Sequence, residues 1–458
     1  MTANKIYMST ELSWEIHKEK VEDIRHQVQD IVASKSSVRL DRSDISHTVP
    51  GAERGTKESS KVDLSALKEI VEIDTADRIC HAESGVSFSD LVKETLKHDL
   101  IPMCVSELKD ITIGGAVAGC SVESMSYKYG GFHDSCVEYE VVTGTGEIIK
   151  CSPSENDELF EMLHGSFGTL GIITLLSFRL IPAKKYVEVN YVRYDDVQDY
   201  FEAIESHRAT NDVDFMDGII HGTDLFVLSL GIFRDEVPYS NTYTWNIYYK
   251  STAERKRDYI PTYDYFFRYD ADCHWVTKNY GLDNKFARLM MGPILGSFIL
   301  GSKNLIRLAN NPIFSKKSQE ASGPEVIVDV FIPIDSMGEF FDWYVKEFDY
   351  FPVWIVPYYI ENFYPWINPE HLKGLKNHFF IDFAIYGFQQ PSDGKNYYRM
   401  LEEKVKEVQG VKTLISHNYY PKEEFWEIHN KELFDRLKER WDPSNIFQDL
   451  YKKMVKNR

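Results

Sequence analysis

Two glycine-rich segments constrain the fold of this chain more than any other feature of its sequence. Residues 112–119 read TIGGAVAG, and residues 165–173 read GSFGTLGII. Glycine serves where the backbone takes positive φ or approaches a bulky group closely. Neither segment fits the nicotinamide fingerprint, in which G-x-G-x-x-G opens a helix directly after a strand and an acidic residue follows about 20 positions later. The pair therefore predicts a cradle for a dinucleotide, and a flavin is favoured over a nicotinamide.

The segments around the first glycine pair agree with a nucleotide-binding domain. SVRLD (37–41) alternates like a short strand, and RSDISHTVPG (42–51) follows it as a loop rich in turn-forming and hydroxyl residues. Such a loop offers N–H and O–H groups to a pyrophosphate. The predicted pyrophosphate contacts in this loop are Ser46, His47 and Thr48.

The pattern changes from Lys185 onward. Segments such as YVEVNYVRY (186–194) and FFIDFAIYGF (379–388) are predicted as strands, and they alternate with helical segments such as residues 397–408. This order predicts an antiparallel sheet covered on one face by helices. A chain of 458 residues that is 43% hydrophobic is too long for one ordinary core, so we expect two domains.

Composition excludes several classes of partner. The formal net charge of -19 argues against nucleic acid, whose phosphates would be repelled. The six cysteines form no C-x-x-C pair and no metal spacing with histidine, so we expect no metal site and a cytoplasmic location. The first residues lack a continuous apolar stretch, so we expect no signal peptide. Residues 290–301 (MMGPILGSFILG) are too short to span a bilayer and are read as core, with a peripheral membrane contact as the alternative.

Longer segments carry a specific resemblance. Residues 112–160 and 168–187 resemble the FAD domain of the Δ24-sterol reductase family, which belongs to the vanillyl-alcohol oxidase/p-cresol methylhydroxylase (PCMH-type) flavoprotein superfamily. FPVWIVPYY (351–359), FIDFAIYG (380–387) and residues 423–441 resemble segments of the substrate half of the same reductases. The resemblance begins near the N-terminus, continues to the C-terminus and is weakest in the middle of the chain.

The resemblance implies an α+β fold. It predicts a PCMH-type FAD-binding domain over residues 1–184 and a second α+β substrate (cap) domain over residues 185–425. The C-terminal segment, residues 426–458, is expected to pack back on the FAD domain.

The resemblance also implies FAD contacts from the predicted loop and from both glycine-rich segments. For the glycines, the alternative is a tight turn or bulge without a ligand. The implied contacts are Ser46, His47, Thr48, Thr112, Ile113, Gly114, Gly115, Gly119, Ser121, Ser124, Gly168, Thr169, Gly171 and Ile173.

His47 has three readings: a covalent tether to the flavin, a hydrogen bond to the pyrophosphate, or a solvated side chain. Several oxidases of the superfamily use a tethering histidine in the corresponding loop, but the sterol reductases lack one. Cys120 invites a second tether by analogy with bicovalent oxidases, although a small buried cysteine is commoner. We therefore expect FAD bound without a covalent bond.

The catalytic candidates lie in the second half of the chain. Asp382 and Tyr386 are four residues apart on a predicted strand, so their side chains point to one face. Burial raises the pKa of a carboxyl, and such a group can donate a proton; the alternative is a hydrogen-bonded structural pair. His417, at the end of a predicted strand over residues 411–417, could supply a proton at neutral pH.

Aromatic residues of the same half are expected to line a pocket for an apolar substrate. Trp354 and Tyr358 are predicted as its π-rich wall, and Asp329 is a further polar candidate. Arg268, Tyr269 and Asp270, with Trp275, have two readings: a clamp for a polar end of the substrate, or a surface ion pair.

Three functions follow from these features. The first is an FAD-dependent reductase that saturates an isolated C=C bond of a sterol or isoprenoid-like lipid, with NADPH as donor. The second is an FAD-linked alcohol or alditol-type oxidase or dehydrogenase, and the third is a non-catalytic flavin- or lipid-binding protein. The resemblance over both halves favours the first, with a hydrophobic small molecule as substrate.

Overall fold

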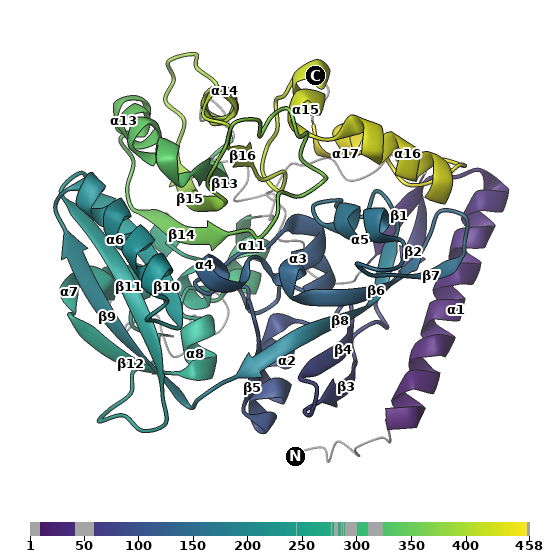
Figure 1. Cartoon of the computed structure of the whole chain (residues 1–458), viewed down its shortest axis with the longest axis horizontal. Coiled ribbons are helices and arrows are strands. Elements are labelled where there is room, and N and C mark those ends of the chain that lie inside the picture. The colour runs from purple at the N-terminus through teal and green to yellow at the C-terminus, as the bar shows by residue number, and fades with distance from the viewer. Residues whose placement is uncertain are drawn as a thin grey trace.

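The computed structural model of the chain (Figure 1) describes residues 10–41, 59–243, 245–275, 277–278, 283–284, 286, 288, 300–309 and 324–455. The predicted pyrophosphate loop with Ser46, His47 and Thr48 lies outside the described residues, and so do residues 290–299. In the part of the chain that the structure describes, no helix combines the length and the apolar character that a membrane crossing needs.

The first half of the chain builds a six-stranded antiparallel sheet and a small parallel pair. The six-stranded sheet has the order β3-β4-β8-β6-β7, and β5 pairs with β8. Its strands are β3 (Ile70–Asp74), β4 (Ile79–Glu83), β5 (Leu100–Pro102), β6 (Cys136–Val142), β7 (Ile148–Cys151) and β8 (Ile172–Pro182). The parallel pair is β1 (Val38–Asp41) and β2 (Ser60–Asp63). The helices of this half are α1 (Thr10–Ser34), α2 (Phe88–Thr95), α3 (Ile113–Gly119), α4 (Ser126–Tyr129) and α5 (Asp157–Leu163).

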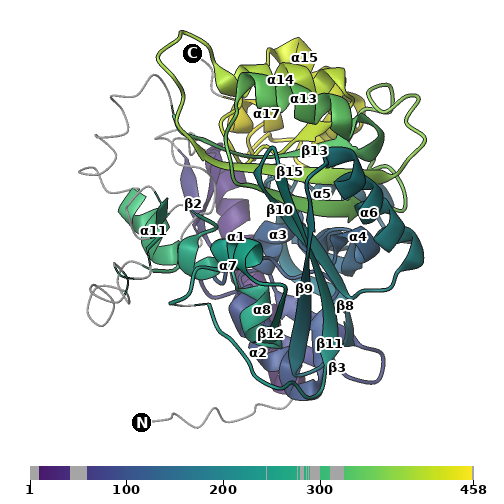
Figure 2. The same ribbon diagram turned by 90° about the vertical axis from the view of Figure 1, so that its left-hand side faces the viewer.

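The second half builds an eight-stranded sheet in which every neighbouring pair is antiparallel, with the order β12-β9-β11-β10-β14-β15-β13-β16. Its strands are β9 (Tyr186–Tyr194), β10 (Phe215–Gly222), β11 (Leu225–Arg234), β12 (Arg257–Pro261), β13 (Val326–Pro333), β14 (Val353–Tyr359), β15 (Phe379–Phe388) and β16 (Val411–Lys412). Its helices are α6 (Val197–Thr210), α7 (Tyr248–Glu254), α8 (Thr262–Phe266), α11 (Ser302–Ala309), α13 (Met337–Glu347) and α14 (Tyr397–Glu407). The predicted antiparallel sheet covered by helices is confirmed, since α13 and α14 lie over β13 and β15 (Figure 2) and α6 packs on β11.

The two faces of the eight-stranded sheet differ in character. Along β15, Phe383 and its odd-numbered neighbours pack into an apolar core with α6, α13 and α14. Ala384 and Tyr386 point the other way and pack against the first half of the chain. Because side chains alternate along a strand, Asp382 shares the face of Ala384 and Tyr386. Polar side chains of this sheet are therefore gathered on the face that meets the first half.

The chain passes from one sheet to the other within three residues. β8 ends at Pro182 and β9 begins at Tyr186. Ala183 N donates to Asp99 O (2.8 Å) and Thr262 N donates to Lys185 O (3.0 Å), so this short connection is bonded to both halves. The division of the chain at residues 184 and 425 stays a prediction.

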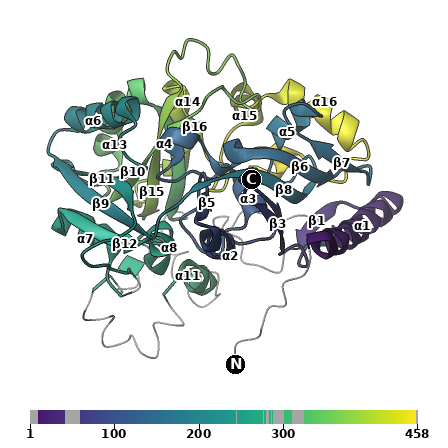
Figure 3. The ribbon, with the colours of Figure 1, turned by 60° about the horizontal axis from the view of Figure 1, so that its bottom comes forward.

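The last helices of the chain, α15 (Lys422–Ile428), α16 (Lys431–Trp441) and α17 (Leu450–Met454), return to the first half. Figures 1 and 3 show α16 beside α5, which it contacts. Lys453 Nζ donates to Phe167 O (2.6 Å), Lys438 Nζ to Thr169 O (3.4 Å) and Val38 N to Ile446 O (2.8 Å). These bonds join the end of the chain to the second glycine-rich segment and to β1.

Helix α1 is held on the first sheet by a buried histidine. His17 Nδ1 lies 3.0 Å from Glu83 Oε1, and His17 Nε2 lies 3.0 Å from Glu140 Oε1. Lys20 Nζ adds a contact of 2.9 Å to Glu83 Oε2. Burial alone lowers the pKa of His17, but the hydrogen bonds to Glu140 and Glu83 outweigh it and raise the pKa to about 9.

We expect this histidine to make stability fall with rising pH. The pKa of His17 is about 9 in the native state and 6.5 in the unfolded state. The resulting gain in the free energy of unfolding is therefore fully present below pH 6.5 and is lost as pH rises through about 9. Below pH 6.5 we expect His17 to contribute about 3 kcal/mol to the free energy of unfolding. Urea unfolding between pH 6 and pH 9 should show the difference between the wild type and His17→Gln shrinking as pH rises; a difference independent of pH would contradict the assignment.

Candidate functional site

The two glycine-rich segments lie side by side. Gly165 N donates to Val117 O (3.3 Å) and Phe167 N donates to Ala118 O (3.2 Å), so the loop after α5 is bonded to helix α3. A Cβ on Gly119, at the end of α3, would lie 3.8 Å from the ring of Phe167. Segments that are distant in the sequence thus form one continuous surface.

The first segment is shaped by its cap and by close packing. The Thr112 hydroxyl caps α3 by accepting from Gly115 N (3.3 Å). Ile113 N donates to Val86 O (3.0 Å), and Gly114 N donates to Ser84 O (2.9 Å). A Cβ on Gly114 would lie 2.6 Å from Ser84 Cβ, which is too close for any side chain. Gly114 is therefore required by packing.

The second segment also has structural reasons for its glycines. Gly168 has φ +70°, a conformation that favours glycine. A Cβ on Gly171 would lie 2.7 Å from Val141 Cγ1, and Ile173 pairs with Val141 across β8 and β6. Thr169 donates to Ser166 O (2.7 Å).

The residues after α3 join the first half to the second. Ser121 O accepts from Phe132 N (3.0 Å), which folds the loop onto itself. Ser124 O accepts from Met216 N of β10 (2.7 Å), and the Ser124 hydroxyl bonds the Glu123 carboxylate. Ser124 thus stands at the junction of the two halves.

Arg268 forms a buried ionic cluster at this junction. Its Nη2 lies 2.9 Å from Glu123 Oε1 and 3.0 Å from Asp217 Oδ2, and the side chains of all three residues are fully buried. Trp354 Nε1 and Tyr269 OH each donate to the same Asp217 Oδ2 at 2.9 Å. Both predicted roles of Arg268 are therefore wrong: its partners are internal carboxylates, and they fix Trp354 on the face directed at the first half.

A second polar cluster lies on the same sheet face. Tyr386 OH donates to Asp329 Oδ1 (2.5 Å) across β15 and β13. The Tyr386 ring centroid lies 4.4 Å from that of His274, whose Nε2 lies 3.3 Å from Glu107 Oε1. Asp382 Oδ1 is buried and has no hydrogen-bond partner among the described residues.

Asp382 of this cluster is held in its neutral form near neutral pH. Burial raises the pKa of Asp382 well above its usual range, and the negative charges of Asp329 and Glu107 raise it further. Burial also raises the pKa of Asp329, to about 7, although the hydrogen bond from Tyr386 opposes the rise. A protonated Asp382 at neutral pH is an acid with a free oxygen, and such a group can donate a proton to a ligand.

The loop after β16 brings this cluster to the end of α3. Thr413 N donates to Asp329 O (3.0 Å), and Ile415 Cγ2 lies 3.8 Å from where a Gly119 Cβ would stand. Thr413 Oγ1 is also buried without a partner among the described residues. An unpartnered polar atom in a loop that contacts a glycine-rich helix end fits a polar ring system such as a flavin.

His417 is not part of this cluster. Its ring packs on that of Tyr398 of α14 (5.4 Å between centroids), and its carbonyl oxygen accepts from Lys412 Nζ (3.0 Å). Tyr398 belongs to the apolar core on the helix-covered face, opposite Asp382. The predicted strand over residues 411–417 is too long: β16 begins at Val411 but ends at Lys412, so His417 lies in a loop.

Sequence reasoning missed several members of the site. Glu107, His274 and Thr413 come from loops that carry no motif. The hydroxyl of Tyr358, a predicted wall residue, bonds that of Tyr364, and its role in the wall stays a prediction. Among the described residues, no group of His, Cys, Asp and Glu side chains is placed to hold a metal ion.

Comparison with known proteins agrees with this geometry. A family model described as an FAD binding domain matches residues 19–152. The chain is 27% identical over 464 residues to a Delta(24)-sterol reductase of Macaca fascicularis, an alignment that covers 96% of this chain and 87% of the relative. It is 23% identical over 439 residues to a Delta(24)-sterol reductase of Arabidopsis thaliana, covering 87% and 77%. The predicted resemblance and the α+β fold with a PCMH-type FAD-binding domain are confirmed.

Proposed function

We propose that this chain, an FAD-binding oxidoreductase of the PCMH type related to the Δ24-sterol reductases, reduces an isolated C=C bond of a sterol or isoprenoid-like lipid with NADPH as donor. The observation that carries the proposal is the buried, unpartnered and neutral Asp382 on the sheet face that meets the FAD-binding domain. The similarity to Delta(24)-sterol reductases over 96% of the chain supports the class of substrate.

The chemistry requires an acid. Bound FAD supplies a hydride, but an isolated alkene has no carbonyl to take up the resulting charge, so a proton must arrive first or together with the hydride. Asp382 donates this proton. Asp329 holds Tyr386 in place and, by its charge, keeps Asp382 protonated. Trp354 and Tyr358 supply the π-rich wall near the positive charge that develops on carbon.

The residues that would hold FAD are those of the predicted set. Gly115, Gly119 and Ser121, from helix α3 and the loop after it, would hold the flavin ring. The surface around it would be formed by Thr112, Ile113, Gly114, Ser124, Gly168, Thr169, Gly171 and Ile173, and the pyrophosphate would be held by Ser46, His47 and Thr48.

Spectra of the purified protein test the proposal. Anaerobic NADPH should bleach the flavin absorbance near neutral pH, and a Δ24-sterol should restore it. Bleaching by alcohols but not by NADPH would favour an FAD-linked alcohol or alditol-type oxidase or dehydrogenase, and a protein that retains flavin without either response would be a non-catalytic binder.

The flavin is expected to be released by acid precipitation, which leaves a colourless pellet. Burial raises the pKa of Cys120 far above its usual range, so this thiol stays neutral and is a poor nucleophile for a tether. Absorbance of the supernatant and pellet checks the result. Flavin retained in the pellet would contradict it and would point to His47.

The protein is proposed to be cytoplasmic, with a peripheral membrane contact through residues 290–301. Two exposed aromatic side chains support such a contact: Trp245 is 50% exposed and Phe286 is 68% exposed. A lipid-dissolved substrate would be taken up there.

A further inference from the structure

A chain of buried polar side chains leads away from the proposed active site. Tyr358 OH bonds Tyr364 OH, and Tyr364 OH donates to Asp134 Oδ2 (2.7 Å). His133 Nε2 lies 3.5 Å from both Asp134 Oδ2 and Tyr358 OH. The ring centroids of His133 and His164 are 4.9 Å apart. Side chains from β14, from the loop after it and from the first half are thus in contact from Tyr358 to His164.

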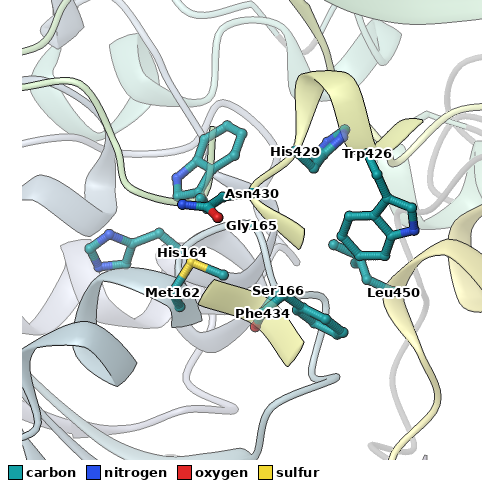
Figure 4. A pocket seen from close by; sticks show the side chains of 10 residues that line it. Met162, His164, Gly165, Ser166, Trp426, His429, Asn430, Phe434 and Leu450 are labelled. Atoms are coloured by element: carbon teal, nitrogen blue, oxygen red, sulfur yellow. The ribbon is translucent and has the colours of Figure 1, made fainter. Parts of the chain in front are cut away.

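The outer end of the path reaches a half-exposed acid and a pocket. His164 Nδ1 lies 3.6 Å from Glu161 Oε2, and Glu161 is 37% exposed. His164 also lines a small pocket between the loop after α5 and the C-terminal helices (Figure 4). The labelled side chains around this pocket include His429, from the end of α15. His164 itself is only 3% exposed, so Glu161 is the end of the path that solvent reaches.

The inner end of the path lies beside the proposed acid. Tyr358 pairs with Phe380, and Val356 pairs with Asp382, so Tyr358 and Asp382 are diagonal neighbours on one face of β14 and β15. Such neighbours are about 7 to 8 Å apart at their Cα atoms, within reach of long side chains or one bridging water. Phe331, directly across from Asp382 on β13, packs on the Tyr358 ring (5.4 Å between centroids).

The two histidines have hydrogen-bonding capacity that the fold leaves unused. His133 Nδ1 and His164 Nδ1 are buried and have no hydrogen-bond partner among the described residues. Most buried polar atoms in proteins are paired, so two such atoms in one path need a reason. Gly131 is shaped to admit the first ring, since a Cβ there would lie 2.8 Å from His133 Nδ1.

We propose that Tyr358, Tyr364, Asp134, His133 and His164 form a proton relay that resupplies Asp382 from the surface at Glu161. The proposal rests on the proposed function. In each turnover the two carbons of the C=C bond receive one hydride, which comes from NADPH, and one proton, which comes from Asp382. NADP⁺ is released, and the carboxylate of Asp382 takes one proton from Tyr358, which regains one from water through the relay. Each hydroxyl or imidazole of the path accepts one proton while it passes on another, and the carboxylate of Asp134 takes up a proton from His133 before it returns one to Tyr364.

Chemical rescue tests the relay. His164→Gly opens space beside the pocket, and imidazole added to the solution can fill that space. We expect repeated turnover of alkene to fall about 10- to 100-fold in this variant, while flavin reduction by NADPH in a single half-reaction is unchanged. Millimolar imidazole should restore most of the turnover.

Two further variants keep the test sharp. His429→Gly opens the same pocket, but His429 Nδ1 donates to Phe425 O (2.8 Å), and its ring contacts among the described residues are with Trp366 and Phe425, outside the path. This variant should therefore lose little turnover and gain nothing from imidazole. Tyr364→Phe removes one hydroxyl without making a cavity and should show the same slowed turnover, with no rescue by imidazole.

The outcomes separate the relay from the proposed function. Wild-type turnover in His164→Gly, loss without rescue by imidazole, or equal loss and rescue in His429→Gly would overturn the relay. If the flavin of the wild type reacts with no alkene at all, the proposed function fails and the relay fails with it.

Discussion

Replacing Asp382 with asparagine is expected to slow the transfer to the alkene by at least about 100-fold, while flavin reduction by NADPH proceeds at the wild-type rate. The carboxyl is buried and its pKa lies well above its usual range, so in the wild type it carries its proton at neutral pH. An amide of the same shape has no proton of comparable acidity. Stopped-flow measurement of the two half-reactions resolves the effect.

Asp329→Asn serves as the matched control. The hydroxyl of Tyr386 can still donate to the amide oxygen, but the negative charge that raises the pKa of Asp382 is gone. The alkene half-reaction should therefore persist and begin to fall at a lower pH than in the wild type. If Asp382→Asn reacts with alkene at the wild-type rate and His417→Ala does not, His417 is the acid and the assignment to Asp382 is wrong.

Replacing Arg268 with methionine is expected to cost about 3 to 5 kcal/mol of stability. Arg268 is the cation that faces the fully buried carboxylates of Glu123 and Asp217. Burial already raises the pKa of Glu123 to about 7, against the attraction of Arg268, so loss of the guanidinium leaves charge that the interior cannot solvate.

The pH dependence and a double variant check this explanation. A carboxyl whose pKa is higher in the native state than in the unfolded state destabilises the fold more as pH rises above its unfolded-state pKa. Arg268→Met should therefore lose more stability at pH 8 than at pH 5. Adding Glu123→Gln should recover part of the loss at pH 8. Urea unfolding measures both, and a loss below about 1 kcal/mol at pH 8 would show that the cluster is not what joins the halves.

Local pattern predicted the regular elements of this chain well. YVEVNYVRY and FFIDFAIYGF correspond to β9 and β15, because period-two alternation and β-branched or aromatic residues are properties of the segment itself. The same alternation placed Asp382 and Tyr386 on one face, which the structure confirms.

Features that depend on distant contacts could not be predicted from the sequence. Arg268 follows a short helix and reads as a surface residue, but its partners Glu123 and Asp217 come from two other parts of the chain. β16 is only two residues long because it pairs with β13 at just two positions. The sequence VKTLISH alone does not indicate where that pairing ends. The contact between the loop residues Glu107 and His274 could not be predicted either, because no local pattern marks two residues that only the fold brings together.

The way the C-terminal helices close the first half has a consequence for biosynthesis. Ile446 and Phe447 complete the apolar cluster that α1, β1 and β2 begin, and Lys453 and Lys438 bind the carbonyls of the second glycine-rich segment. The ribosome releases these residues after those of the second sheet. The cluster of the N-terminal half therefore stays incomplete while the second sheet is translated, and we expect FAD to be captured only after the helices α16 and α17 have been released.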